Sequence, residues 1–154
     1  MKKKTCAITG GAGFTLVELM VTIGLFAILA GIAIPGFSKW LPGYHLKSAA
    51  RDFFSNLQLA KLEAIKQNIN CTIDVDPGWK SYSINREDGT TIKTVSLMGY
   101  DDGVFFDPSS TSTIAFNNRG MANSSGQFKI TNDIISAIYE VNVSNVGSIS
   151  LKKL

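Results

Sequence analysis

The hydrophobic and polar positions divide the chain into three parts, and the first is the most distinctive. Residues 19–37 form an apolar run of nineteen residues without a charge, and Glu18 lies at its edge. At a rise of about 1.5 Å per residue, a helix of this length spans about 28 Å, close to the hydrocarbon core of a bilayer. A carboxylate at the bilayer centre costs about 2.5–3.5 kcal/mol, and less near an interface. The run therefore predicts a membrane-spanning helix whose acid has a partner.

The second part, residues 38–69, has the period of an amphipathic helix. One stripe of apolar residues recurs every three or four positions: Leu46, Ala50, Phe53, Leu57, Ala60 and Ala64. Pro35 and Pro42 punctuate the approach to this part, and each removes a backbone donor, so we expect a kink or a loosened region over residues 34–44. The broad apolar surface predicts that this helix carries a sheet.

After Asn70 the chain changes to short β-rich segments separated by turn residues. Such segments cover residues 71–75, 79–84, 91–97, 104–106, 113–116, 127–130, 138–143 and 147–151. In the turn Asp76-Pro77-Gly78, Pro presets φ and Gly tolerates a positive φ. Short strands at this spacing predict a mostly antiparallel sheet. The expected fold class is therefore α+β, with a long N-terminal helix, half membrane-spanning and half amphipathic, packed on a β-rich domain over residues 70–154.

The charge balance depends on the first few residues. The chain has 15 Lys and Arg against 12 Asp and Glu, and the three lysines at positions 2–4 account for the difference. Their place before the apolar run predicts an N-terminus in the cytoplasm and a remainder outside it. Without them the net charge is zero, so the alkaline pI is no argument for nucleic acid binding.

Two ordinary interpretations compete for the N-terminal region. The first is a secretory signal peptide cleaved near residues 30–33. Against it, ten polar or small residues separate the lysines from the apolar core, and that core is too long and begins beside Glu18. The second is an unprocessed membrane anchor that holds a periplasmic binding domain. A third interpretation places a cut between Gly13 and Phe14, before the apolar run.

The third interpretation rests on a resemblance. The sequence Gly13-Phe14-Thr15-Leu16-Val17-Glu18-Leu19 resembles the processing site of the type IV pilin superfamily, and here it follows a short basic leader and precedes a membrane-length run. Pro35 stands where many pilins also carry Pro. The resemblance implies that a membrane aspartyl prepilin peptidase removes residues 1–13 and methylates the new amino terminus. Gly13 and Phe14 are thus the expected processing residues, and residues 14–37 the transmembrane and assembly helix.

The same resemblance implies a role for Glu18. Cleavage leaves a positive amine on Phe14, about one helical turn away. In a bundle of such helices, the amine of one subunit neutralises Glu18 of the next and offsets the cost of the carboxylate in apolar surroundings. Glu18 and Pro35 are therefore the expected assembly residues. The expected partners are the peptidase, other pilins or pseudopilins in a helical filament, and inner-membrane lipid before assembly.

Three further stretches resemble the GspH/FimT pseudopilin group within this superfamily. They are residues 59–65 at the end of the amphipathic helix, the Phe-x-x-x-Gly element from Phe116 to Gly120, and residues 143–147 with their closing Gly. This resemblance implies a minor subunit that primes or tips a filament, in pilus biogenesis or type II protein secretion. Both machines use the same N-terminal chemistry, so the sequence leaves the choice open.

Other functions find less support in the residues. The chain lacks Gly-x-Ser-x-Gly, His-Glu-x-x-His and a phosphate-binding glycine loop, so neither an enzyme nor a cofactor is expected. Asp101, Asp102 and Asp107 are candidate Ca²⁺ ligands, but their spacing lacks the alternation of a calcium loop. Some members of the GspH/FimT group bind DNA through a basic stretch after the closing Gly. Here only Lys152 and Lys153 follow, so DNA uptake is the alternative function and nucleic acid is not an expected partner.

Two single residues have ordinary explanations. His45 has no second ligand at metal-binding spacing, so we expect a solvated or capping histidine. Cys6 leaves with the leader, which leaves Cys71 without a partner for an internal disulfide. Because Cys71 opens a predicted strand, we expect it to behave as a small buried hydrophobe.

Overall fold

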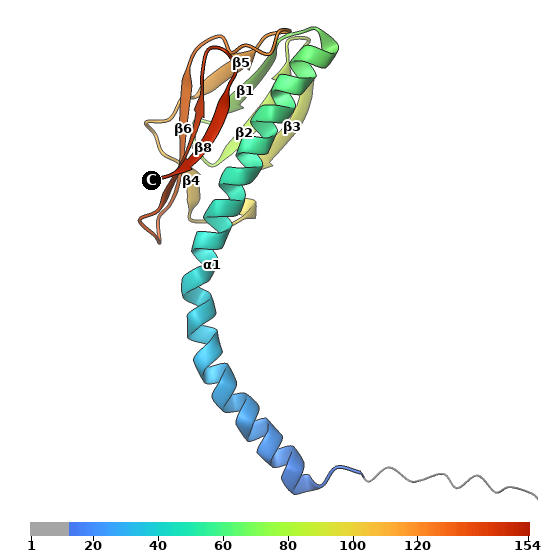
Figure 1. The fold of residues 1–154 in the computed structure, drawn as a ribbon, viewed down its shortest axis with the longest axis vertical. Coiled ribbons are helices and arrows are strands. Elements are labelled where there is room, and N and C mark those ends of the chain that lie inside the picture. Colours follow the sequence, from blue (N-terminus) through green and yellow to red (C-terminus); the bar gives the residue numbers. More distant parts are fainter. Residues whose placement is uncertain (1–12) are drawn as a thin grey trace, which may run out of the picture. The chain divides into compact units, whose positions relative to one another are not determined.

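The computed structural model describes residues 13–154 as one long helix followed by short strands (Figure 1). The elements are α1 (Leu16–Gln67), β1 (Cys71–Val75), β2 (Ser81–Arg86), β3 (Thr91–Ser96), the 3-10 helix η1 (Leu97–Gly99), β4 (Val104–Phe106), β5 (Thr113–Phe116), β6 (Gly126–Asn132), β7 (Ile138–Val143) and β8 (Ile149–Lys153). The chain forms two compact units, the first ending at Ser38 and the second comprising Lys39–Leu154.

The strands form two four-stranded sheets. The strand order is β3-β2-β1-β5 in the first sheet and β4-β6-β7-β8 in the second, and all of these neighbours are antiparallel. The chain crosses to the second sheet at β4, returns for β5 and crosses again for β6. The antiparallel arrangement is confirmed. The division into two sheets was not predicted, because a period of two identifies a strand without identifying its partner.

The second part of α1 supplies the centre of the core. All six residues of the predicted apolar stripe are fully buried, and the helix runs alongside the strands (Figure 1). The ring of Phe53 lies 4.9 Å from that of Tyr82 in β2 and 5.0 Å from those of Phe106 in β4 and Phe128 in β6. These edge-to-face contacts are favourable aromatic geometry. Because β2 belongs to the first sheet and β4 and β6 to the second, Phe53 joins the helix to both.

Helix α1 continues across Pro35 and Pro42, so neither proline ends it, and the kink or loosened region expected over residues 34–44 stays a prediction. A proline removes one hydrogen bond from the ladder. Helix propagation is cooperative, so the turns on either side persist without a new nucleus. The helix Leu16–Gln67 therefore runs without interruption through both predicted segments, 14–37 and 38–69.

The turn between β1 and β2 differs from the expected one. The positive φ belongs to Trp79 (+59°) and not to Gly78, and β2 begins at Ser81. The Asp76 carboxylate accepts a hydrogen bond from the Gly78 N–H at 2.8 Å, and the Trp79 N–H donates to the Asp76 carbonyl at 2.8 Å. The Trp79 carbonyl in turn accepts from the Phe106 N–H at 2.7 Å. These contacts hold an uncommon backbone conformation for a bulky residue.

We expect Phe53→Ala to lower the free energy of unfolding by about 3–5 kcal/mol, because it removes the ring that contacts both sheets and leaves a cavity. Leu62→Ala, on the same helix but at a side chain that is 63% exposed, should cost about 0.5 kcal/mol. Denaturant titration of the two variants, followed by tryptophan fluorescence, measures the difference. Equal losses would show that Phe53 is not the centre of the core.

Candidate functional site

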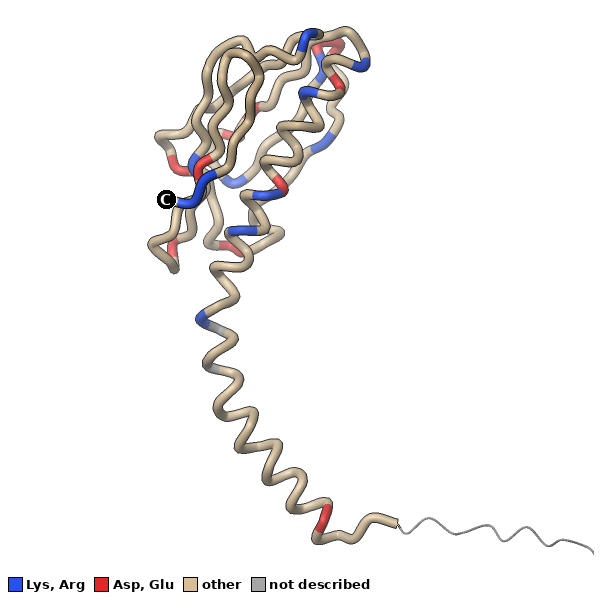
Figure 2. Tube along the Cα trace, in the orientation of Figure 1, with Lys and Arg blue, Asp and Glu red and all other residues tan. Residues whose placement is uncertain are grey.

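The start of α1 presents an apolar surface that no part of residues 13–154 covers. Every side chain from Gly13 to Ile34 is exposed, and Leu16–Ile34 is long and apolar enough to cross a membrane. Figure 2 shows the charged positions gathered in the second unit, with one acidic position near the start of the helix. An apolar surface of this size is unfavourable in water, so this segment requires lipid or other protein around it.

Helix α1 begins with an N-cap on Thr15, which the sequence analysis did not predict. The Glu18 N–H donates to Thr15 Oγ1 at 3.1 Å, and the Leu19 N–H donates to the Thr15 carbonyl at 3.1 Å. Thr15 and Glu18 have the spacing of a capping box, a pattern visible in the sequence. An acid in the first turn also interacts favourably with the positive end of the helix dipole. Gly13 and Phe14 precede the helix, so the bond between them is in non-helical chain.

Of the predicted processing and assembly residues, Gly13, Phe14 and Glu18 lie together at the start of α1, whereas Pro35 does not. Pro35 lies within the same helix, seventeen residues after Glu18. At about 1.5 Å per residue this separation is about 25 Å, so Pro35 belongs to no common site with the other three. The roles of these four residues stay predictions.

The three stretches that carried the subgroup resemblance meet at the Gln67 end of α1. Lys61 Nζ donates to the Gly147 carbonyl at 2.9 Å. Gly120 and Gly147 have φ of +75° and +78°. A Cβ on Gly120 would lie 2.8 Å from Ile65 Cδ1, and one on Gly147 would collide with the Gly120 carbonyl oxygen. Both positions therefore require glycine for backbone conformation and for space. We call Lys61, Gly120 and Gly147 the glycine clasp.

A buried polar network fixes the same helix to the first sheet. Asn56, only 4% exposed, donates to the Tyr82 hydroxyl at 2.6 Å and to Asp52 Oδ2 at 3.1 Å. Lys93 Nζ donates to Asn56 Oδ1 at 3.0 Å, and the Tyr100 hydroxyl donates to Asp52 Oδ2 at 2.7 Å. Burial raises the pKa of the Tyr82 hydroxyl, which keeps it protonated. The network is internally satisfied, so its role is to fix the position of the helix.

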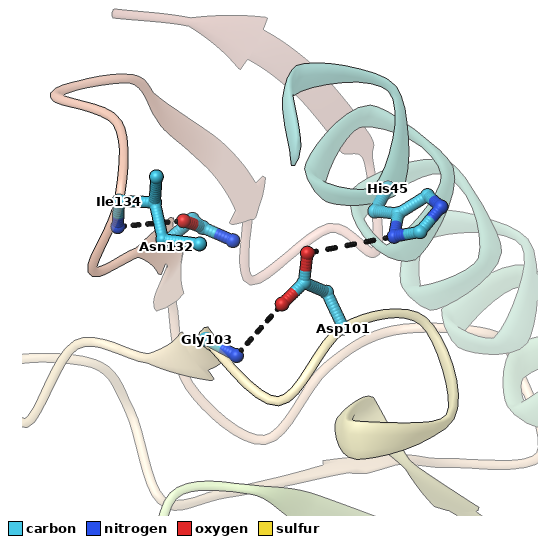
Figure 3. Close-up of polar contacts among 5 residues, drawn as sticks. All are labelled: His45, Asp101, Gly103, Asn132 and Ile134. Atoms are coloured by element: carbon cyan, nitrogen blue, oxygen red, sulfur yellow. Dashed lines mark hydrogen bonds and ion pairs between the residues drawn. The ribbon is translucent and has the colours of Figure 1, made fainter. Parts of the chain in front are cut away.

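His45 is not the solvated or capping residue that we expected. It lies inside α1, and its Nδ1 is 3.5 Å from Asp101 Oδ2 (Figure 3). Asp101 Oδ1 accepts from the Gly103 N–H at 3.0 Å. Asn132 Oδ1 accepts from the Ile134 N–H at 2.8 Å, while Asn132 Nδ2 is buried without a hydrogen-bond partner among the described residues. The contact between His45 and Asp101 links α1 to the loop before β4, a pairing too distant in sequence for spacing to reveal.

The candidate Ca²⁺ ligands Asp101 and Asp107 make local contacts, and Cys71 is buried. Asp101 and Asp107 lie on either side of β4, and Asp107 Oδ1 accepts from the Ser109 N–H at 2.8 Å. Within residues 13–154, no group of three or more His, Cys, Asp or Glu is placed to hold a metal ion. Cys71 is fully buried, as predicted, and burial raises the pKa of its thiol. A thiol in that state is a poor nucleophile.

Lys152 and Lys153 lie in β8, and both side chains are exposed to solvent. Lys152 is the cross-strand partner of Glu140, which is also the partner of Lys129. A hydrogen bond from Asn142, helped by the charges of both lysines, lowers the pKa of Glu140. Successive residues in a strand face opposite ways, so Lys153 does not share this surface. The two lysines therefore do not form one cationic patch.

Two protein-family models match the chain. One, described as "Type II transport protein GspH", matches residues 49–147. The other, described as "Prokaryotic N-terminal methylation motif", matches residues 10–34. The chain is also 34% identical over 92 residues to "Prepilin peptidase-dependent protein D" of Escherichia coli (strain K12). That match covers 60% of this chain and 59% of the relative, so the chain spans less than two thirds of the relative's length.

Two solved structures share the fold. The type IV minor pilin FimU of Pseudomonas aeruginosa is 21% identical, with a TM-score of 0.58, and the match covers 70% of this chain and 87% of that one. The minor pseudopilin EpsH of the Vibrio cholerae type 2 secretion system is 15% identical, with a TM-score of 0.57. This match covers 70% of this chain and 96% of EpsH. At these identities the likeness shows the fold alone, and the predicted pilin-like α+β fold is confirmed.

We expect Gly147→Ala to destabilise the second unit more than Gly89→Ala does. Both glycines have a positive φ, but a Cβ on Gly89 (φ +85°) meets nothing within 4 Å. Gly89→Ala should therefore cost only the backbone strain, about 1–2 kcal/mol. Gly147→Ala should cost about 1–3 kcal/mol more, because the clasp must open to admit the methyl group. Denaturant unfolding measures both variants, and equal losses would contradict the clasp.

Proposed function

Because the chain belongs to the type II transport protein GspH family, we propose that it is a minor pilin or pseudopilin, a structural subunit of a type IV pilus or a type II secretion filament. Prepilin peptidase processes it, and its N-terminal helix assembles it into the filament. The single observation that carries this function is the exposed apolar helical segment Leu16–Ile34, whose one charged residue is Glu18, within the residues that the methylation-motif model matches.

Processing requires a peptide bond that a peptidase can reach. The Gly13–Phe14 bond precedes the helix, and the Thr15 cap starts the helical hydrogen bonds immediately after it. Cleavage there, followed by methylation, places the new amine of Phe14 at the N-terminus of α1. Because the positive end of the helix dipole disfavours a cation at that place, the amine gains from an acid nearby.

Glu18 supplies that acid. In the first turn of α1 it offsets the dipole and the amine of its own chain. In a bundle, Glu18 also pairs with the amine of a neighbouring subunit, which compensates its burial among apolar helices. The helix thereby exchanges lipid for the apolar surfaces of its neighbours, and close packing and this ion pair supply the preference for the filament.

Before assembly, the Leu16–Ile34 segment holds the chain in the inner membrane. The lysines at positions 2–4 orient it with the N-terminus in the cytoplasm, which places the second unit in the periplasm. The partners are prepilin peptidase and then other pilin-type subunits. Both GspH-type secretion and pilus biogenesis use a subunit of this construction.

Gly13→Ala should block cleavage, because the added methyl group stands on the residue whose bond is cut. Intact-mass spectrometry of protein from host membranes should then give the mass of the full precursor, whereas the wild type loses residues 1–13. Gly11→Ala, two residues earlier in the leader, is the matched control and should be processed normally. A mature mass for Gly13→Ala would remove Gly13 from the processing site.

Glu18→Ala should leave membrane insertion intact and reduce incorporation into sheared filaments about tenfold or more, because the amine of the neighbouring subunit loses its partner. Glu18→Gln separates the two roles of this residue, since Gln preserves the capping-box pattern without the charge. Quantitative immunoblotting of membrane and filament fractions measures both variants. Normal incorporation of Glu18→Gln would leave capping, and not the ion pair, as the function of Glu18.

A further inference from the structure

Four exposed apolar side chains surround the glycine clasp at the Gln67 end of α1. They are Leu62 (63% exposed), Ile65 (45%), Met121 (41%) and Val146 (73%). Leu62 and Ile65 come from α1, Met121 from the turn after β5 and Val146 from the turn after β7. Single exposed apolar residues are ordinary, but four side chains from three segments around one point mark an interaction surface.

The glycine clasp holds the segments that carry these four side chains against one another. A Cβ on Gly120 would touch both Ile65 and Lys61, and Gly147 packs on the Gly120 carbonyl. The Ala122 N–H also donates to the Asn145 carbonyl at 3.1 Å, which joins the two turns directly. Beside them runs a groove of about 320 Å³, lined by Gln58, Lys61, Leu62, Gly147, Ser148 and Ile149. We call the four apolar side chains and this groove the clasp face.

Two cations, Lys66 and Arg119, stand at the edge of the clasp face, and an acid, Glu87, lies just past the end of α1, where it accepts a hydrogen bond from the Asn70 N–H at 3.2 Å. Lys66 follows Ile65 on α1 and Arg119 precedes Gly120; both are exposed, and neither makes an ion pair within residues 13–154. The Asn118 amide donates to Asn68 Oδ1 at 2.8 Å, which holds the turn carrying Arg119 against the end of α1. The acid on this part of the helix, Glu63, is already paired with Arg86 at 3.1 Å.

We propose that the clasp face is a docking surface for the globular unit of another pilin-type subunit, which presents apolar side chains bordered by Asp or Glu. Lys66 and Arg119 favour a partner surface that carries acids, because neither cation is neutralised by an ion pair within the described residues. The apolar helix of a neighbouring subunit, if it resembles residues 19–34 of this chain, has no charge to offer them.

The clasp face lies far along α1 from the start of the second unit. From Lys39, where the second unit begins, to Leu62 the helix rises about 35 Å. The clasp face is therefore at the far end of this unit from the junction with the apolar segment. The identity of the partner as a pilin-type subunit rests on the proposed function. The location of the surface rests on the exposed apolar side chains and the charges of the second unit.

A photo-crosslinking residue in place of Val146, in the full chain and in the native host, tests the proposal. Irradiation of assembled filaments should join this position to a different protein that carries an N-terminal methylation motif, identified by mass spectrometry. The same residue in place of Thr94, exposed on β3 in the first sheet, is the matched control and should not capture that protein. Capture of a second copy of this chain, of lipid only, or of nothing would overturn the proposal.

Charge reversal tests the chemistry of the partner. Lys66→Glu combined with Arg119→Glu should lower the crosslink yield at Val146 about tenfold, because like charges then oppose one another. Lys80→Glu, an exposed lysine at the start of β2, and Arg119→Lys should leave the yield unchanged. An unchanged yield after the double reversal would overturn the acidic partner.

The same samples separate this inference from the proposed function. If the wild-type chain is neither cleaved after Gly13 nor found in filaments, the proposed function fails. If it is cleaved and incorporated but Val146 captures no pilin-type subunit, the clasp face alone fails.

Discussion

One helix has to satisfy two different surroundings, and the rest of the structure follows from that constraint. Over Leu16–Ile34 it is apolar apart from Glu18, and none of residues 13–154 covers it. Beyond Lys39 it is apolar on one stripe, which is fully buried against two sheets. The apolar residues thus lie all round the first part of the helix and on one side of the second part. The first part needs lipid or similar helices around it, whereas the second part carries a folded domain.

Within the folded unit, polar contacts fix what the apolar stripe alone leaves free. A stripe of Ala, Leu and Phe can slide or rotate by part of a turn at modest cost, whereas buried hydrogen bonds tolerate little displacement. Asn56 connects the helix to Tyr82 in the first sheet. Lys61, nearer the end of the helix, connects it to Gly147 in the turn between β7 and β8 of the second sheet. His45 makes a third connection near the start of the unit, through Asp101. Together these contacts restrict where the helix lies against the two sheets.

The sequence predicted those features that depend on local periodicity. The core stripe of α1, the burial of Cys71 and several strand bounds follow from residues a few positions apart, and all are found. It did not predict the two sheets or the contact of His45 with Asp101, because these depend on residues far apart in the chain. The Thr15 cap was not predicted, although Thr15 and Glu18 have the local spacing of a capping box. The turn residues predicted a positive φ at Gly78, but Trp79 has it instead, because hydrogen bonds to Asp76 and Phe106 hold Trp79 in that conformation.

The last strand of the second sheet has a consequence for solubility. β8 is an edge strand, and an unpaired edge is a template for pairing with the edge of another molecule. Lys152 and Lys153 stand on this edge, and lysines there oppose such pairing by charge repulsion and by their hydration. Without such charges, two molecules that meet could aggregate by pairing these strands. The lysines at this edge thus disfavour strand pairing between folded units through β8 and leave association to other surfaces.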